Sequence, residues 1–398
     1  MSDRRDFLRK TVMLGAGAAV VSRTELFGKE PELQQKKKIT PEPLTGNTYP
    51  VEMGYIRAPA RTPRKINIPD VEGYKALKGD FHIHTLFSDG HVMPYHRVRD
   101  AVDNGLDVIS ITDHFEYRPY FSQKGKWKLI DETGFNFNIW YDIGKAEADK
   151  AGLLLVRGGE ITKSVMPPGH FNALFTTDNN AIFAAVDNWR DMLRVAHEQG
   201  AFLLWNHPGW EAPKSGGIEK GAPLVFTKEH EEAWKNGWLN GIEIFNSTSY
   251  YPVVSDWANE RDLALFANSD IHATELEHYG LQNPLRPINI LLCKDRTVES
   301  VKDAMFGKRM IAWAANTLWG RDPWMPTLFK ACVSIKTISP GTLSLKNTSS
   351  LPINVTLGGV SFDLPENIER QVYIAEGVKQ MTVTNWMMAM NKPLIVQV

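Results

Sequence analysis

Cysteine is scarce in this sequence, which holds only Cys293 and Cys332 among its 398 residues. Neither lies in a CxxC pattern, so a thiolate zinc site and a disulfide-rich scaffold are both excluded. A single disulfide between the two stays open as an alternative, but we expect two free, buried thiols. A metal site in this chain would therefore be built from nitrogen and oxygen ligands.

An excess of either charge is also lacking. The 45 Lys and Arg residues balance 46 Asp and Glu residues, which leaves no electrostatic footprint for nucleic acid or an anionic membrane, and we expect neither as a partner. The sequence has no GxSxG elbow, no P-loop and no GxGxxG turn that opens a helix, so serine hydrolases, NTPases and Rossmann proteins have no support. Its 43% hydrophobic content is that of a soluble globular protein with one large domain and a smaller one.

No apolar run near the N-terminus is long enough to span a bilayer stably. The short run Thr11–Val21 is rich in Gly and Ala and follows the charged segment Asp3–Lys10, an arrangement typical of export signals. Its Arg-Arg-x-Phe-Leu-Arg-Lys pattern resembles a twin-arginine signal. We predict a signal peptide over residues 1–30 and a periplasmic location, with no membrane span after signal removal; the alternative is a frayed basic terminus. The polar, proline-bearing residues 31–63 are predicted to form a linker.

Between residues 64 and 325, apolar runs alternate with helical spacing. Strands are expected at 106–111, 153–156, 201–205, 263–267, 288–292 and 310–313, and helices at 95–104, 188–199, 230–238, 255–261 and 298–306. Strands that alternate with helices predict a parallel α/β arrangement. Such folds place their functional residues at the carboxyl ends of the strands.

The stretch Asp80–Gly90 is predicted to be a strand that runs into a turn. Phe81 and Ile83 alternate with His82 and His84, so strand geometry places both imidazoles on one face. Two imidazoles at this spacing can hold one metal ion. The alternative is a half-buried strand that happens to carry two histidines.

Comparable residues follow other strand ends and complete a set of six imidazoles and three carboxylates. The candidate ligands are His82, His84, Asp89, His114, Glu160, His170, His207, Asp270 and His272. Individually each has an ordinary explanation, such as a loop histidine or a turn aspartate, but their placement at successive strand ends makes coincidence improbable. The set suffices for two or three divalent ions, and its ligand types fit Zn, Mn or Fe better than Ca.

The motifs HxHTxxSDG, TDH, a GE loop, NHPG and SDIH, in this order, resemble the PHP (polymerase and histidinol phosphatase) family over about residues 78–315. The resemblance implies a distorted (β/α)7 barrel over residues 64–325 with a trinuclear metal site that hydrolyses phosphoesters. It implies three ligand sets: His82, His84, Glu160 and Asp270 for one metal; Glu160, His170 and His207 for a second; and Asp89, His114 and His272 for the third. Some family members carry His where Asp89 stands.

Within the family, TDHFEYRP together with EITKSxxPPGHFN is similar to a subgroup of bacterial phosphodiesterases that act on small organophosphate diesters. We therefore predict hydrolysis of small phosphodiesters by a hydroxide that bridges two metals. Glu160, His207 and Asp270 are the predicted catalytic residues. Substrate contacts are predicted for loop residues near the strand ends: Arg118, Lys163, Arg286 and His278.

Three alternatives share the same metal site. The first is a phosphomonoesterase of the histidinol-phosphatase kind, and the second is a nuclease, which the neutral charge disfavours. The third is a non-enzymatic, metal-stabilised binding module in which the C-terminal domain does the work. That domain, residues 326–398, has short alternating runs at 333–338, 342–346, 353–357, 370–374 and 381–385, a pattern that predicts a small β-sandwich packed against the barrel.

Overall fold

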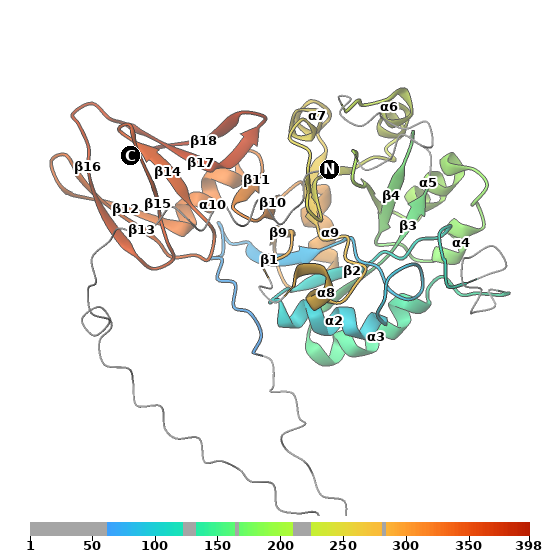
Figure 1. Cartoon of the computed structure of the whole chain (residues 1–398). Coiled ribbons are helices and arrows are strands. Elements are labelled where there is room, and N and C mark those ends of the chain that lie inside the picture. Colours follow the sequence, from blue (N-terminus) through green and yellow to red (C-terminus); the bar gives the residue numbers. More distant parts are fainter. Residues whose placement is uncertain (1–61, 122–132, 164–166, 210–223, 281–283) are drawn as a thin grey trace, which may run out of the picture. The chain divides into compact units, whose positions relative to one another are not determined.

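The computed structural model describes residues 62–121, 133–163, 167–209, 224–280 and 284–398 (Figure 1). The predicted signal peptide and almost all of the predicted linker lie outside these residues. Within them, no helix has the length and apolarity needed to cross a membrane.

The larger part of the described chain alternates strands with helices (Figure 1). In order its elements are β1 (Lys75–Asp80), α2 (Pro94–Asp103), β2 (Val108–Ile111), α3 (Ile139–Ala151), β3 (Leu154–Thr162), β4 (His170–Leu174), α4 (Asn179–Phe183), α5 (Trp189–Glu198), β5 (Phe202–Trp205), α6 (Lys228–Lys235), β6 (Gly241–Asn246), β7 (Ser249–Tyr250), α7 (Val254–Arg261), β8 (Ala264–Asn268), α8 (Glu275–Tyr279), β9 (Ile288–Cys293), α9 (Val298–Phe306), β10 (Met310–Ala314) and β11 (Thr317–Trp319). The predicted α/β class is confirmed.

The sheet is mixed, which corrects the expectation of a parallel one. β1 pairs with β2, β2 with β3, β5 with β6 and β6 with β8 in parallel, but β3–β4, β4–β5 and β1–β9 are antiparallel. β3 ends at Thr162 and β4 begins at His170, a connection too short for the crossover that parallel neighbours need. β4 and the helix α3 were not expected from the sequence.

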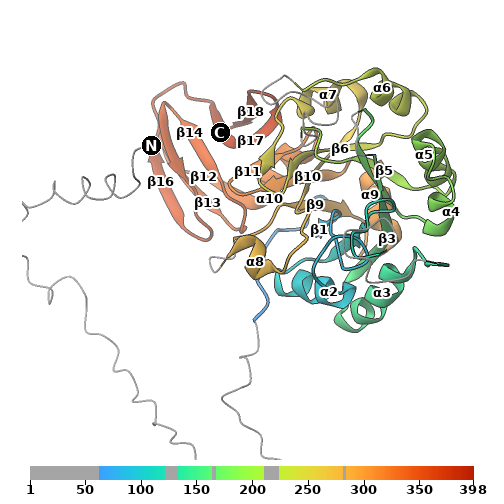
Figure 2. The same cartoon turned by 45° about the vertical axis from the view of Figure 1, so that its right-hand side comes forward.

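The chain beyond β1 and the chain beyond β8 come together at the carboxyl ends of these strands. β1 stops at Asp80, earlier than predicted, so the two histidines lie just past the strand. The backbone stays extended there, because Ile83 forms a parallel bridge with Ile271. Helices α2 to α7 lie around the strands in Figure 2. Closure into a (β/α)7 barrel stays a prediction.

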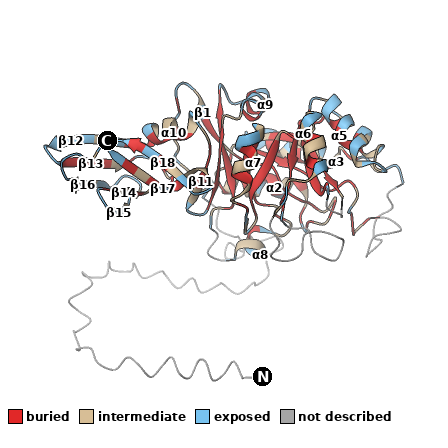
Figure 3. Cartoon of the chain, turned by 90° about the horizontal axis from the view of Figure 1, so that it is seen from above, coloured by how far each residue is buried: buried red, intermediate tan, exposed pale blue. Residues whose placement is uncertain are grey.

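Most strands of the α/β part are buried on both faces, whereas C-terminal strands such as β12 and β16 are largely exposed, as Figure 3 shows by their colour. Successive residues of a strand point to opposite faces of a sheet. In β5, Phe202 and Leu204 join one apolar cluster with Phe266, whereas Leu203 and Trp205 join the other. This packing on two sides makes a rigid support for the loops at the strand ends. Cys293 and Cys332 are both free and buried, as expected.

The C-terminal part begins within α10 (Trp324–Cys332), a helix that crosses the predicted domain boundary at residue 325. The strands that follow are β12 (Val333–Ser339), β13 (Thr342–Asn347), β14 (Asn354–Leu357), β15 (Val360–Asp363), β16 (Glu369–Tyr373), β17 (Gln380–Ala389) and β18 (Lys392–Gln397). β12, β13 and β16 form one antiparallel sheet, while β14, β15, β17 and β18 join the main sheet through the parallel pair β11–β17. β15 and β18 were not predicted, and the sandwich arrangement stays a prediction.

Candidate metal centre

Two extended segments deliver ligands to the same point. After β1, Phe81 and Ile83 are buried with 0% exposure in two different apolar clusters, while His82 and His84 both face Glu160. The backbone N–H of Asp270 donates to the carbonyl of His82 at 2.9 Å, which places its carboxylate beside both imidazoles. The predicted shared face of the two histidines is thus present, although it lies past the end of β1.

Four donor atoms surround one point in what we call the inner group, formed by His82, His84, Glu160 and Asp270. Glu160 Oε2 lies 3.2 Å from His82 Nε2 and 3.3 Å from His84 Nε2. Asp270 Oδ1 lies 3.2 Å and 3.1 Å from the same two atoms. A tetrahedral ion with bonds of about 2.0–2.1 Å has ligand atoms about 3.3 Å apart. These four carboxylate–imidazole distances match the spacing that such an ion requires.

The other oxygen of Glu160 faces a middle group, formed by Glu160, His170 and His207. Glu160 Oε1 lies 2.8 Å from His170 Nδ1 and 3.8 Å from His207 Nε2. One carboxylate thus presents a different oxygen to each group. This is the arrangement that the sequence resemblance implied for a bridging ligand.

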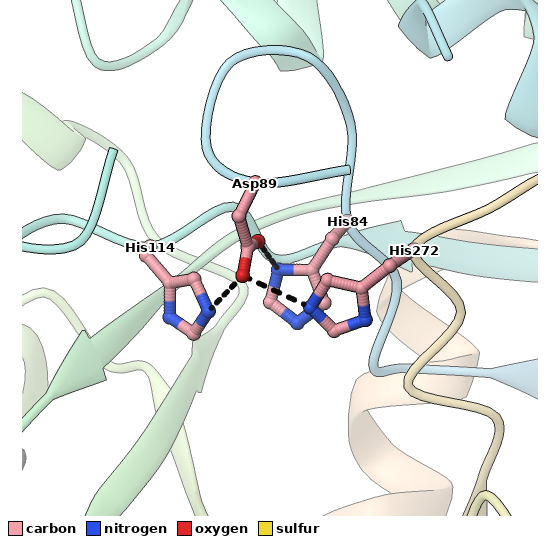
Figure 4. Close-up of side chains that lie close together, drawn as sticks. All are labelled: His84, Asp89, His114 and His272. Atoms are coloured by element: carbon pink, nitrogen blue, oxygen red, sulfur yellow. Dashed lines mark ion pairs between the residues drawn. The ribbon is translucent and has the colours of Figure 1, made fainter. Parts of the chain in front are cut away.

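An outer group consists of Asp89, His114 and His272 (Figure 4). Asp89 Oδ2 lies 3.3 Å from His272 Nε2 and 3.6 Å from His114 Nε2. Its Oδ1 lies 3.7 Å from Nδ1 of His84, whose Nε2 belongs to the inner group. Asp89 comes from the turn after β1, and the two histidines come from the chain beyond β2 and β8.

The donor set fits divalent ions. Nitrogen and carboxylate oxygen atoms suit Zn, Mn and Fe, and each of the nine predicted ligands belongs to at least one cluster whose donor atoms lie within 4.8 Å of one another. His84 Nε2 and Asp270 Oδ1 are both buried and lie 3.1 Å apart, so both are placed to ligate one ion. The binding of metal by these residues stays a prediction.

Electrostatics in the metal-free site keep its carboxylates ionised. Burial acts to raise the pKa values of Glu160 and Asp270, but the surrounding imidazoles lower both far below the ordinary carboxyl value. Burial likewise acts to lower the pKa of His84, but hydrogen bonds with the same two carboxylates raise it to about 10. Burial and the nearby His170 lower the pKa of His207 to about 3. Without metal, the protons on His82 and His84 therefore supply the positive charge beside the two carboxylates.

Two of the predicted ligands sit in a backbone conformation that residues with a Cβ seldom adopt. His207 has φ 26° and Asp270 has φ 50°. Strain of this kind persists only where the surrounding structure enforces it, and it gathers at functional sites. The conformation turns each side chain out of the line of its strand and toward Glu160 or the inner histidines.

Of the four residues predicted to contact substrate, His278 lies beside the metal groups, and its side chain faces the neutral hydroxyl of Ser247. His278 is half-buried within electrostatic reach of Asp270 and His272, and its Nε2 lies 3.3 Å from Ser247 Oγ. Burial lowers its pKa.

The three cations are engaged elsewhere. Lys163 Nζ lies 2.7 Å from a carboxylate oxygen of Glu116. Arg286 is buried between Asp80 and Glu275, at 3.3 Å and 3.0 Å. The guanidinium of Arg118 lies among phenyl rings, from 4.5 Å to 5.9 Å from the centroids of Phe121, Phe135, Phe137 and Phe183. Roles for these side chains in binding substrate stay predictions.

Several buried residues around the ligands were missed in the sequence. Glu243 of β6 contacts His82, Asp113 accepts a hydrogen bond from Ser88 Oγ at 2.7 Å, and Thr162 Oγ1 lies 2.6 Å from His114 Nδ1. One signal was available for Glu243, since an acidic residue within the apolar run GIEIFN is rarely buried without a partner. Asp113 and Thr162 lie within the motifs TDH and EITKS, to which no role for these two residues was assigned.

Comparison with known proteins finds a relative that matches most of this chain. No model of a known protein family and no curated protein matches the sequence. One similar solved structure is a two-domain protein from Bacteroides vulgatus that contains a predicted PHP-like metal-dependent phosphoesterase. It is 31% identical, the match covers 85% of this chain and 99% of that one, and the TM-score is 0.75.

Two further structures are much less similar. One is a proposed metal-dependent phosphoesterase from Bifidobacterium adolescentis, with 16% identity over 57% of this chain and 95% of that one and a TM-score of 0.38. The other is PsfC from Pseudomonas syringae, with 15% identity over 59% and 89% and a TM-score of 0.36. Neither likeness carries an argument. The Bacteroides relative spans both parts of the described chain, and on that match this protein belongs to the family of PHP-like metal-dependent phosphoesterases.

Proposed function

We propose that this protein hydrolyses small phosphodiesters with two or three divalent ions, of Zn, Mn or Fe, bound by the inner, middle and outer groups. The observation that carries the proposal is the inner group, where four donor atoms from three separate segments meet and each carboxylate oxygen lies 3.1–3.3 Å from both imidazole Nε2 atoms. Two imidazoles and two carboxylates that meet in a buried place are a donor set typical of a site for a divalent ion. Family membership supports the same chemistry.

Each side chain has a distinct task in this mechanism. Glu160 holds the inner and middle groups at a fixed separation, because each of its oxygens faces a different histidine set. His207 completes the middle group and Asp270 the inner group, and donor atoms of these two residues and His82 lie within 4.8 Å of one another. When bound, divalent ions polarise a phosphoryl oxygen and lower the pKa of water from 15.7 to about 7, which supplies a nucleophile at neutral pH. Burial of the groups strengthens these electrostatic effects by excluding bulk water.

The charge around the site supports a diester in preference to a monoester. A monoester brings two negative charges at neutral pH and a diester brings one, so the monoester needs more cationic side chains. Lys163 and Arg286 are already paired with carboxylates. These pairings favour the substrate with less charge.

Turnover of bis-p-nitrophenyl phosphate and of p-nitrophenyl phosphate, with the metal-loaded protein, tests this proposal. A higher kcat/KM for the diester is the expected result. A monoester rate far above the diester rate would show that the alternative phosphomonoesterase is correct. A panel that includes phosphotriesters and a short oligonucleotide would detect the nuclease alternative.

We also propose that residues 64–325 form a distorted (β/α)7 barrel and residues 326–398 a β-sandwich. The bridge between Ile83 and Ile271 supports closure of the barrel, and the two antiparallel sheets of the C-terminal part support the sandwich. Export through a twin-arginine signal to the periplasm is a further proposal. Cell fractionation of the natural host tests it, and recovery of the protein in the cytoplasmic fraction would contradict it.

A further inference from the structure

We propose that Glu243 is a positioning residue that holds His82 and His207, and with them the inner and middle groups, in the orientation that binds metal. This inference rests on the proposed function and goes beyond it, since Glu243 is not one of the nine predicted ligands. Glu243 has 0% exposure and lies on β6, where it contacts one residue of each group. A buried carboxylate requires hydrogen-bond partners, and those of Glu243 include two of the predicted ligands.

The first oxygen of Glu243 sets the tautomer of His82. Glu243 Oε1 lies 2.9 Å from His82 Nδ1. An ionised carboxylate can only accept, so Nδ1 carries the hydrogen and donates it. Once a metal displaces the second ring proton, the lone pair is on Nε2, the atom that faces Glu160 and Asp270 in the inner group. A carboxylate on the far nitrogen of a ligating histidine fixes the ring and increases its basicity.

The second oxygen holds the backbone of His207. The N–H of His207 donates to Glu243 Oε2 at 2.7 Å. This is the residue whose φ of 26° lies in the left-handed region. A strained backbone needs such an anchor to persist. Through this bond, Glu243 keeps the imidazole of His207 turned toward Glu160.

Both oxygens also accept a second hydrogen bond, and the whole arrangement demands a carboxylate. Asn268 Nδ2 donates to Oε1 and Asn246 Nδ2 donates to Oε2, each at 2.9 Å. The Asn268 amide cannot turn over, because its own oxygen accepts from the N–H of Phe81 at 3.0 Å. The backbone N–H of His207 cannot become an acceptor either. A carboxamide at position 243 would therefore direct its NH2 group against a fixed donor in either orientation.

Glu243→Gln is accordingly the informative variant, since it keeps the size of the side chain and removes one acceptor. Cobalt(II) is titrated into the chelator-stripped full-length protein, with and without Asp89→Asn, a change that disables the outer group. In the Asp89→Asn background we expect Glu243→Gln to raise the cobalt Kd about 10–100-fold. With Asp89 intact, the cobalt of the outer group should remain.

Glu275→Gln is the matched control. Glu275 is also a buried glutamate, but its carboxylate accepts from Arg286 at 3.0 Å and contacts none of the nine predicted ligands. It should bind cobalt as the wild type does. A Glu243→Gln protein with unchanged cobalt affinity would overturn the proposal, and so would one that loses the outer ion together with the others.

A measurement on the unmodified protein decides the matter if Glu243→Gln fails to fold. In the zinc-loaded protein labelled with 15N-histidine, His82 should show a protonated Nδ1 and an unprotonated Nε2. An unprotonated Nδ1 would overturn the proposal. None of these experiments uses a substrate, so a lack of phosphodiesterase activity would refute the proposed function and leave this inference intact.

Discussion

At the scale of single residues, one buried cation joins the two segments that supply most of the ligands. Arg97 of α2 has 0% exposure, and its guanidinium donates to the carbonyl oxygens of His84, Ala273 and Ile271 at 2.8, 2.7 and 3.1 Å. The fork of the guanidinium therefore fixes the chain beyond β1 against the chain beyond β8. Only arginine supplies donors in this planar geometry.

Replacing Arg97 by lysine should weaken both the fold and the outer group. A lysine keeps the charge but cannot serve three carbonyl oxygens at once, so the free energy of unfolding should fall by about 2–4 kcal/mol. Denaturant unfolding of the metal-free protein measures the change. The control is Arg99→Lys on the same helix, where the ion pair with Glu147 is exposed and a change below about 0.5 kcal/mol is expected. Equal stability of the two variants would show that Arg97 does not join the segments.

Protonation of the inner histidines should make metal binding depend on pH. The pKa of His84 is about 10 in the metal-free protein, above its ordinary value of 6.5, and that of His82 is also raised. Both rings are therefore protonated on both nitrogens and positively charged at pH 7. A metal must displace these protons, so its apparent Kd should fall as pH rises from about 6 toward 9. His207, with a pKa of about 3, releases none.

Calorimetry of zinc binding in two buffers with different ionisation enthalpies counts the protons released. The same shift affects stability: a raised pKa stabilises the metal-free fold fully below pH 6.5, and this contribution is lost as pH rises through about 10. An apparent zinc affinity that does not change with pH would contradict the description of the metal-free site.

At the scale of elements, the turn after β1 leaves no space for a side chain at Gly90. A Cβ atom built there would lie 2.7 Å from the backbone carbon and oxygen of His84, and backbone cannot move aside as a flexible side chain can. The N–H of Gly90 also donates to the carbonyl of Thr85 at 2.9 Å, which closes the turn that carries Asp89. The turn and the outer group thus depend on the same glycine.

Gly90→Ala should therefore cost stability and remove the outer ion. Overpacking of this kind costs about 1–3 kcal/mol, and displacement of Asp89 should lower the metal content by one ion per chain. Thermal unfolding and metal analysis of the purified variant check both effects. If the variant is destabilised but keeps the wild-type metal content, the outer group does not depend on this turn.

The sequence predicted which side chains gather at one place better than it predicted the elements that carry them. The order of the motifs was enough to identify nine residues, because the spacing of these motifs in the family reflects which side chains lie close together in the fold. The end of β1 at Asp80 and the antiparallel strand β4 were missed, since both depend on pairing with distant chain such as Ile271 and β3. A local pattern cannot show such partners. For the same reason the sequence placed Lys163 and Arg286 near substrate without revealing the carboxylates that already pair with them.

At the scale of the whole molecule, the two parts share one continuous sheet. β11 pairs with β17 through Leu318 and Trp386, and Trp386 is buried with 0% exposure against Phe329 of α10, at 5.7 Å between ring centroids. The C-terminal part thus continues the support of the α/β body, and it contributes no side chain to the metal groups found among the described residues. The predicted ligands therefore lie in the α/β part, and the C-terminal part adds to its structural support.

The central claim is that the nine side chains bind metal ions that carry out the hydrolysis. The most direct test is to measure, on one preparation, metal content per chain and turnover of bis-p-nitrophenyl phosphate, for the wild type and for Glu160→Ala. The account predicts two or three equivalents of Zn, Mn or Fe in the wild type. Loss of Glu160 should remove metal from the inner and middle groups and lower kcat/KM at least about a thousandfold, or roughly 4 kcal/mol of transition-state stabilisation. Full activity of Glu160→Ala, or an active wild type with substoichiometric metal, would contradict it.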